Sequence, residues 1–217
     1  IILRTPRVGQ GKARQAGIEK SKNKFIAFLD FDDIWHPSKM EMQINKLEKN
    51  NASFSFTSYR NVNTLDNSLL SNVLIKKSLS LIDLFISNPI AVSSVVCSRN
   101  IFDGDFQFSQ IRNRSDYATW LRIYRDRKPK TIYLSDYLVL ISKRPGSLSS
   151  KYWVSSLGLK TIIKVYKDFG FNNIHSILIG IIFSFFQFFV KANRKYNFLN
   201  SKKSTNINDF PYESFLK

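Results

Sequence analysis

The chain has 217 residues, of which 43% are hydrophobic and 19 are phenylalanine, so it has enough apolar side chain to form one good core. This composition excludes a disordered chain, and the low counts of eight glycines and six prolines exclude collagen-like and low-complexity proteins. The 33 Lys and Arg residues outnumber the 16 Asp and Glu residues, and the resulting charge of +17 indicates an anionic partner: a phosphate-bearing substrate, an acidic lipid surface or a nucleic acid.

The beginning of the chain and its single cysteine indicate its setting. Ile1, Ile2 and Leu3 carry neither an initiator Met nor a signal-peptide pattern, so we expect the chain to begin inside a longer domain. Cys97 cannot form an internal disulfide, which fits a reducing compartment. Because it lies in an apolar run, we expect it to be a small core residue.

The first third of the chain is expected to alternate helices and strands. Residues 10–22 predict a short helix, and 25–29 are a continuous apolar run, typical of a strand that is covered on both faces as in a parallel sheet. A helix from about 38 to 49 and an alternating strand over 52–59 follow. This order is typical of an α/β protein.

The remaining elements continue the same alternation. Residues 80–86 predict a short helix, 90–97 an apolar strand, and 115–126 an amphipathic helix. Residues 131–142 predict a further strand, and 155–167 a helix.

An acidic turn, Asp30-Phe31-Asp32-Asp33, follows the predicted strand at 25–29. In open α/β sheets the carboxyl ends of strands are where ligands bind. Two carboxylates one residue apart suit Mg²⁺ or Mn²⁺, which reach proteins through few carboxylates and substrate phosphates. The alternative is a solvated acidic turn that caps the helix after it.

The residues around this turn resemble the central block of family-two glycosyltransferases. In that family an Ala-Arg-Asn-x-Gly helix leads to a buried strand ending in Asp-x-Asp, often followed by Asp-x-Trp-x-Pro-x-Lys. The matching segments here are Ala13-Arg14-Gln15-Ala16-Gly17, Asp30-Phe31-Asp32 and Asp33-Ile34-Trp35-His36-Pro37-Ser38-Lys39. Gln15 stands where Asn is common.

Two later blocks agree with the resemblance. Ser115-Asp116-Tyr117-Ala118-Thr119-Trp120-Leu121-Arg122 is similar to the family's Glu-Asp-Tyr-Asp-Leu-Trp-Leu-Arg, which makes Asp116 the implied general base. Ser115 replaces Glu and Ala118 replaces Asp. Arg144-Pro145-Gly146-Ser147-Leu148-Ser149 resembles the family's closing loop, so that Arg144 or Lys143 would bind the donor diphosphate; the alternative is a solvated basic loop.

The resemblance implies an α/β, GT-A (Rossmann-like) domain with a mixed sheet flanked by helices. It would occupy residues 1–150, without the N-terminal strands that hold the nucleotide base in the family, and residues 151–217 would form a helical segment. The implied enzyme is inverting and dependent on Mn²⁺ or Mg²⁺. Asp30 and Asp32 would hold the metal; Arg14, Asp30, Asp32 and Arg144 would contact a nucleotide-sugar donor. The acceptor would be a glycan or lipid-linked glycan in surface polysaccharide assembly.

A long apolar segment at 174–190 ends the recognisable part of the chain. Its small and polar residues form one narrow helical stripe, which favours a helix lying in a membrane interface with its phenylalanines, Phe183 among them, facing lipid. The basic residues that follow, Lys191, Arg194 and Lys195, would meet anionic headgroups. We therefore expect a cytoplasmic protein, peripheral at the inner face of the cell membrane. The alternative is a helix that packs on the catalytic domain or dimerises.

Two other function classes compete with an active enzyme. The departures at Ser115 and Ala118, together with the expected missing strands, are also what an inactive, truncated transferase remnant would show. A basic nucleic-acid-binding protein is supported by charge alone, since zinc-finger spacing and RNP-like aromatic motifs are absent from the sequence. We therefore expect no nucleic-acid partner.

Overall fold

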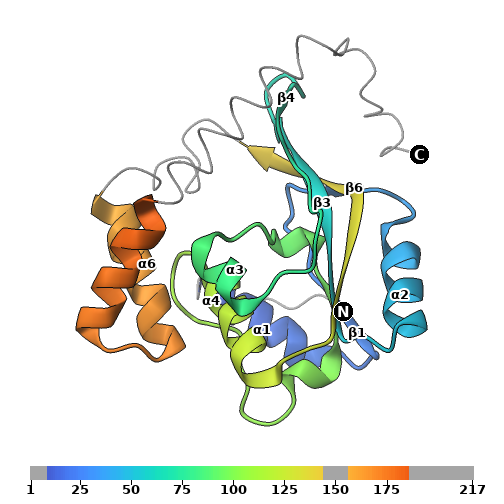
Figure 1. Ribbon diagram of the computed structural model, residues 1–217. Coiled ribbons are helices and arrows are strands. Elements are labelled where there is room, and N and C mark those ends of the chain that lie inside the picture. The colour runs from blue at the N-terminus through green and yellow to red at the C-terminus, as the bar shows by residue number, and fades with distance from the viewer. Residues whose placement is uncertain (1–8, 144–155, 186–217) are drawn as a thin grey trace.

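The computed structural model describes residues 9–143 and 156–185, which form an α/β architecture (Figure 1). In chain order the elements are α1 (Gln10–Lys20), β1 (Phe25–Ala27), β2 (Ile34–Trp35), α2 (Lys39–Lys49), β3 (Phe54–Asn63), β4 (Leu69–Val73), α3 (Leu81–Ile86), η1 (Val92–Ser94), β5 (Val96–Ser98), η2 (Arg99–Phe102), α4 (Ser115–Arg122), η3 (Ile123–Arg127), β6 (Thr131–Lys143) and α6 (Ser156–Phe169), and residues 173–185 are also helical.

The sheet is mixed. Its strand order is β1-β5-β3-β6-β2, with β4 paired to β3 off this path. The long central strands β3 and β6 run parallel, from the pair Phe54 and Thr131 to the pair Asn63 and Lys143, and all other pairs are antiparallel. This confirms the predicted GT-A-like sheet flanked by helices.

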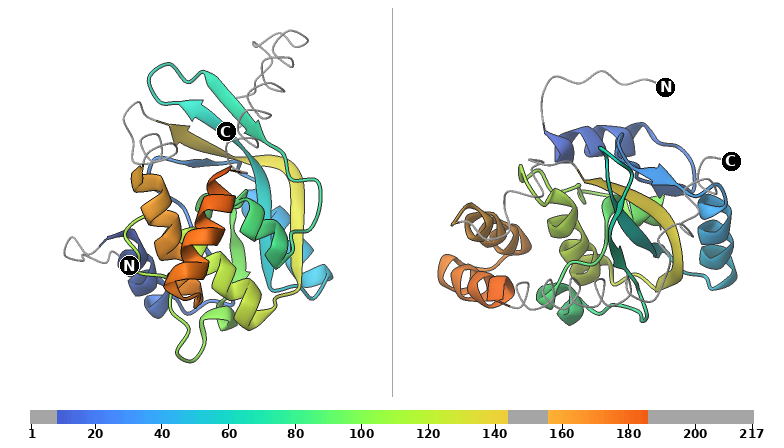
Figure 2. Two further views of the ribbon diagram at one scale, coloured as in Figure 1. Left: turned by 60° about the vertical axis from the view of Figure 1, so that its left-hand side comes forward. Right: turned by 90° about the horizontal axis from the view of Figure 1, so that it is seen from above.

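The helices cover the two faces of the sheet unequally. α2 lies alone on one face, while α1, α3 and α4 lie on the other (Figures 1 and 2). α6 packs outside α4, so it forms a further layer at the edge of the molecule. The acidic turn leads from β1 into β2 and then α2. Because β1 and β2 are at opposite ends of the strand order, the chain passes here from one edge of the sheet to the other.

β1 is covered on both faces, as predicted from its apolar run. Ile26 and Phe28 join the main core, whereas Phe25 and Ala27 pack against a second cluster around Leu47 of α2. The expected parallel neighbour is wrong, because the partner of β1 is the antiparallel β5. An apolar run records burial on both faces, and it does not record the direction of the adjacent strand.

The predicted strand at 90–97 is mostly a tight turn. Only its last residues belong to β5, and Val92–Ser94 form a 3₁₀ turn. The turn is closed by the Ser94 N–H and Ser94 hydroxyl, which both donate to the Ala91 carbonyl, at 3.0 and 2.7 Å. Local hydrogen bonds from serine compete with a strand ladder in this way. Cys97, in β5, is a fully buried core residue as expected.

α6 and the helix at 173–185 form a hairpin around Gly170, whose φ is 114°. Two residues of the predicted small and polar stripe, Ser176 and Gly180, are buried against the protein, whereas Ser184 is exposed. The expected orientation of Phe183 toward lipid is wrong, because its ring is buried against Tyr117 of α4. Within 9–143 and 156–185, helices fall short of the length and apolarity needed to cross a bilayer.

Candidate active site

Ser93 holds the acidic turn in place. The turn is closed by the Asp33 N–H, which donates to the Asp30 carbonyl at 3.0 Å. Asp30 N–H donates to the Ser93 hydroxyl oxygen at 3.1 Å, and that hydroxyl donates to Asp33 Oδ2 at 2.6 Å. The Trp35 indole N–H donates to the Ser93 carbonyl at 2.7 Å. The 3₁₀ turn in place of the predicted strand thus positions a serine that connects both ends of the turn.

Asp33 is an anchoring carboxylate. Its Oδ2 accepts from Ser93, and its Oδ1 accepts from the Ser142 N–H of β6 at 3.0 Å. Burial raises the pKa of Asp33 to about 6; its hydrogen bonds lower the pKa, and the negative charges of Asp30 and Asp32 raise it further. The Ser142 hydroxyl also donates to the Asp32 carbonyl. Because both carboxylate oxygens are engaged, Asp33 ties the turn to the sheet.

Arg14 and Asp30, two of the predicted site residues, form an ion pair. Arg14 Nη2 lies 2.7 Å from Asp30 Oδ1, and the two side chains are 13% and 36% exposed. The guanidinium also lies over the Phe108 ring, 5.5 Å from its centroid. A partly buried, charge-assisted hydrogen bond of this length is stronger than an exposed pair. It fastens α1 to the end of the strand that carries the acidic turn.

The loop at 107–110 connects α1 with α4. Gln15 Oε1 accepts from the Phe108 N–H at 2.8 Å, and the Ser109 N–H donates to Thr119 Oγ1 at 2.9 Å. Gly11 lies so close to this loop that a Cβ would be 2.1 Å from the Ser109 carbonyl oxygen. The residue that departs from the family's usual Asn, Gln15, therefore makes a specific contact with the loop.

Asp116 and Lys143 complete the cluster. Asp116 is half-buried in the first turn of α4, and Lys143 is the last residue of β6. Burial lowers the pKa of Lys143 below its ordinary value, and four negative charges counteract this, those of Asp33, Asp116, Asp32 and Asp30. The negative charges of the acidic turn and of Asp116, at the start of α4, thus act on the same lysine.

Of the predicted site residues, Arg14 and Asp30 are in direct contact, and the charges of Asp30, Asp32 and Asp116 all act on Lys143. Arg144 lies outside the described residues, and its role stays a prediction. The sequence analysis assigned no role to Ser93 or Ser142. Ser93 lies in an apolar run, and only its hydrogen-bond partners in the structure reveal its role. Arg114 was also missed; it is held at a φ of 59°, and Asp116 acts on its buried charge.

The carboxylates of the acidic turn are candidate metal ligands. Among the described residues, no group of three or more His, Cys, Asp or Glu side chains is arranged to hold a metal ion. Asp33 is fully engaged and Asp30 holds Arg14, which leaves Asp32 as the carboxylate that no described side chain engages. One or two carboxylates completed by substrate phosphates are how Mg²⁺ is commonly held, so this donor set fits such an ion.

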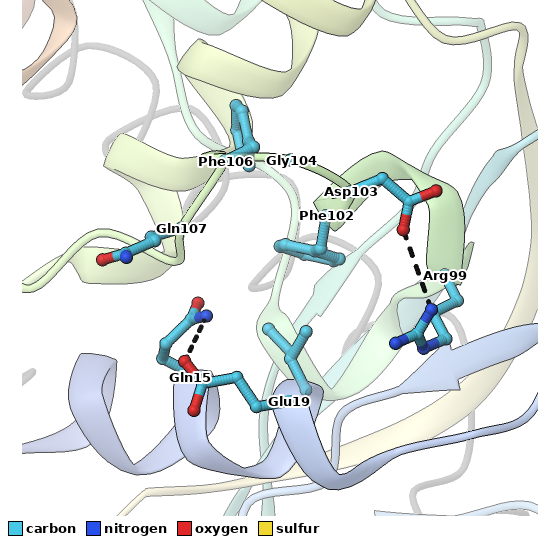
Figure 3. A pocket seen from close by; sticks show the side chains of 9 residues that line it. Gln15, Glu19, Arg99, Phe102, Asp103, Gly104, Phe106 and Gln107 are labelled. Carbon is cyan, nitrogen blue, oxygen red and sulfur yellow. Dashed lines mark hydrogen bonds and ion pairs between the residues drawn. The ribbon is translucent and has the colours of Figure 1, made fainter.

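A separate pocket lies beside α1. It measures about 280 Å³ and is lined by the end of α1 and residues 99–107, among them Glu19, Arg99 and Asp103 (Figure 3). Glu19 is occupied by Gln15, and Arg99 pairs with Asp103 at 3.7 Å. The pocket does not include the acidic turn or Asp116, so it is distinct from the carboxylate cluster.

Comparison with known proteins points the same way. The family model described as glycosyl transferase family 2 matches residues 1–136. The chain is 33% identical over 124 residues to the Escherichia coli UDP-Glc:alpha-D-GlcNAc-diphosphoundecaprenol beta-1,3-glucosyltransferase WfgD, covering 57% of this chain and 47% of that protein. It is 30% identical over 146 residues to the Bacillus subtilis putative teichuronic acid biosynthesis glycosyltransferase TuaG, covering 67% of this chain and 57% of TuaG. The chain thus spans about half the length of these relatives.

A solved structure supports the fold. The crystal structure of S. aureus TarS 1–349 in complex with UDP-GlcNAc superposes with a TM-score of 0.58 at 16% identity, covering 83% of this chain and 53% of that chain. At this identity the likeness concerns the fold, and it agrees with the mixed sheet described above.

Proposed function

We propose that this chain, which belongs to glycosyl transferase family 2, transfers a sugar from a nucleoside-diphosphate sugar to an acceptor hydroxyl. The transfer inverts the configuration at the anomeric carbon. The observation that carries the proposal is the environment of Lys143, on which the acidic turn and Asp116 both act. A transferase of this kind needs a base for the acceptor and positive charge for the diphosphate in one place. A carboxylate cluster with Asp116 elsewhere would not meet that need.

In the proposed reaction the acceptor oxygen attacks the anomeric carbon while its proton passes to a carboxylate oxygen of Asp116. The bond between the anomeric carbon and the diphosphate oxygen breaks, and its electron pair leaves with the nucleoside diphosphate. One displacement inverts the configuration, and no covalent enzyme intermediate forms. The negative charge of Asp116 also acts on the guanidinium of Arg114, two residues earlier in the chain.

The positive side chains of the site are assigned to the donor. We assign binding of the diphosphate to Lys143, to Arg144 next in the chain, and to Arg14, whose side chain is positioned by its ion pair with Asp30. We assign Mn²⁺ or Mg²⁺ to Asp32 with Asp30 beside it; a bound ion would neutralise charge on the departing diphosphate. Because Lys143 is half-buried, its charge is weakly screened by solvent and acts strongly on a nearby phosphate.

The proposed acceptor is a lipid-linked glycan, used in surface polysaccharide assembly at the inner face of the cell membrane. The support is the relative WfgD, a glucosyltransferase that acts on alpha-D-GlcNAc-diphosphoundecaprenol. The departures from the family pattern do not weigh equally against activity. Ala118 is fully buried in the core, so replacement of the family's Asp there changes packing and leaves the cluster around Lys143 as it is.

The test is transfer from a panel of UDP and dTDP sugars with Mn²⁺, comparing the wild-type chain with Asp116→Asn. We expect Asp116→Asn to lower turnover by about 10²-fold or more while nucleotide binding, measured by calorimetry, stays within about twofold. Asp136→Asn is the matched control, because Asp136 is an exposed residue of β6 and loses the same charge. Unchanged turnover in Asp116→Asn would place the base elsewhere. Nucleotide binding without transfer from any donor would identify the inactive remnant.

A further inference from the structure

The helix at 173–185 turns an apolar face away from the protein. Its exposed large residues recur at spacings of three and four, which places them on one face of a helix. They are Ile174 (69% exposed), Ile177 (43%), Leu178 (53%), Ile181 (50%), Ile182 (55%) and Phe185 (63%). A soluble surface rarely collects this many large apolar side chains on one element, so the face indicates contact with a further partner.

The opposite face of the same helix is fixed to the domain. Ser176 is fully buried, and a Cβ on Gly180 would lie 3.3 Å from the Ile163 side chain of α6. The Phe183 ring stacks on Tyr117 of α4 with 5.5 Å between centroids. The helix therefore packs through its small and aromatic residues, and the apolar face is not the one that holds it in place.

Lysines accompany this face on the neighbouring helix. Lys160, Lys164 and Lys167 are exposed and follow one side of α6, at spacings of four and three. The opposite side of α6, with Val165 and Tyr166, is buried against the domain. The outer surface of the hairpin thus combines apolar residues with positive charge (Figure 2 shows the hairpin at the edge of the molecule). This pairing is what an interfacial helix presents to anionic lipid.

We propose that the hairpin formed by α6 and residues 173–185 docks on an anionic bilayer. The apolar face enters the boundary between headgroups and acyl chains, and the lysines of α6 contact the phosphates. A second copy of the chain is a poorer occupant, because two molecules of net charge +17 repel one another whereas anionic lipid attracts each. Phe183 joins the docked helix to Tyr117, next to Asp116, so docking holds the acceptor side of the site near the membrane. This last consequence rests on the proposed function; the docking itself does not.

The experiment is flotation of the whole chain with vesicles of phosphatidylglycerol and phosphatidylcholine, and with phosphatidylcholine alone. We expect binding to the anionic vesicles, and a loss of at least about tenfold in Leu178→Glu/Ile181→Glu. Leu65→Glu/Ile82→Glu is the matched control, since both residues are more than 70% exposed and lie in other elements. It should bind within about twofold of wild type. Lys160→Gln/Lys164→Gln should weaken binding to the anionic vesicles and leave any binding to phosphatidylcholine vesicles unchanged.

Wild-type protein that stays unbound with anionic vesicles would overturn the proposal, as would equal binding by the Leu178→Glu/Ile181→Glu variant. A dimer seen by light scattering, split by that variant and accompanied by no vesicle binding, would assign the face to a second copy instead. Transfer to a short, water-soluble acceptor separates this from the proposed function. If flotation fails and transfer is retained, only the docking proposal is wrong. If the protein floats with vesicles and transfers no sugar, only the proposed transferase activity is wrong.

Discussion

At the scale of single residues, the acidic turn is supported by side chains from distant parts of the chain. Ser93 and Ser142 each donate a hydrogen bond to one carboxylate oxygen of Asp33, and burial raises the pKa of Asp33. Asp30 is engaged by Arg14. The three neighbouring carboxylates therefore differ: Asp33 orients the turn, Asp30 pairs with Arg14, and Asp32 is engaged by no described side chain.

Lys39 is an unusual buried lysine close to this turn. Its side chain is fully buried, and Nζ lies 4.1 Å from the centroid of the Trp35 ring. Within the described residues Nζ has no hydrogen-bond partner. Burial lowers the pKa of Lys39 to about 7. The amine is therefore protonated in the unfolded chain and largely neutral in the folded one between pH 7 and about 10.

This difference predicts a pH dependence of stability. Because the unfolded chain binds one more proton in that range, the free energy of unfolding should rise with pH from 7 to 9, by up to about 1.4 kcal/mol per pH unit. Lys39→Met should remove that rise, measured by urea denaturation at pH 7 and 9. Lys46→Met, at an exposed position of the same helix, should retain it. Equal slopes in Lys39→Met and wild type would show that Lys39 stays protonated in the folded protein.

At the scale of elements, α1 and α4 are held in register by the loop at 107–110. Gly11 approaches the Ser109 carbonyl, Gln15 accepts from Phe108, and Thr119 accepts from Ser109. α1 carries Arg14 and α4 carries Asp116. The position of these two charged residues relative to each other therefore depends on one close backbone approach.

Two glycines of α1 provide a matched test of that approach. A Cβ on Gly11 would clash with the Ser109 carbonyl at 2.1 Å, whereas a Cβ on Gly17 would have nothing within 4 Å. We expect Gly11→Ala to lower the free energy of unfolding by about 1–3 kcal/mol, because α1 must move off the loop. Gly17→Ala should raise it by about 0.5–1 kcal/mol through helix propensity. Chemical denaturation measures both, and similar effects at the two positions would contradict the proposed role of the contact.

At the scale of the whole molecule, the C-terminal hairpin is part of the same core as the sheet. Tyr166, Phe169 and Phe183 belong to the main apolar cluster together with Trp120 of α4. The predicted division into residues 1–150 and 151–217 places its boundary in a segment outside the described residues, and stays a prediction. α4 links the hairpin to the candidate site, because Tyr117 contacts Phe183 of the hairpin and the adjacent residue is Asp116.

Phe183 is the side chain that makes this joint measurable. Its ring is 2% exposed and contacts both Tyr117 and Tyr166, so Phe183→Ala should lower the free energy of unfolding by about 3 kcal/mol or more. Phe185→Ala removes the same ring from a position that is 63% exposed, and should cost less than about 1 kcal/mol. Thermal or urea denaturation of the pair distinguishes them. Equal stability would mean that the hairpin does not share the core.

The sequence by itself determined most of the helices and the order of the motifs, but it predicted neither β2 nor β4, and the strand it predicted at 90–97 is mostly a turn. The apolar spacing in α2, α4 and β6 is a local property, and the structure has helices and a strand at the predicted places. The motif resemblance placed Arg14, Asp30 and Asp116 in one family pattern, and the family is confirmed, while their individual roles remain proposals.

Only the tertiary structure decided how these pieces meet. It made 92–94 a turn that presents Ser93 to the acidic turn, set β1 antiparallel to β5, and placed four carboxylates so that their charges act on Lys143. It also turned Phe183 inward, while Leu178 of the same helix faces outward. Periodicity shows that a helix has an apolar side, but the side that is buried depends on the shape it must fit. On the helix at 173–185 that shape favoured the small residues Ser176 and Gly180, because only they allow α6 to approach so closely.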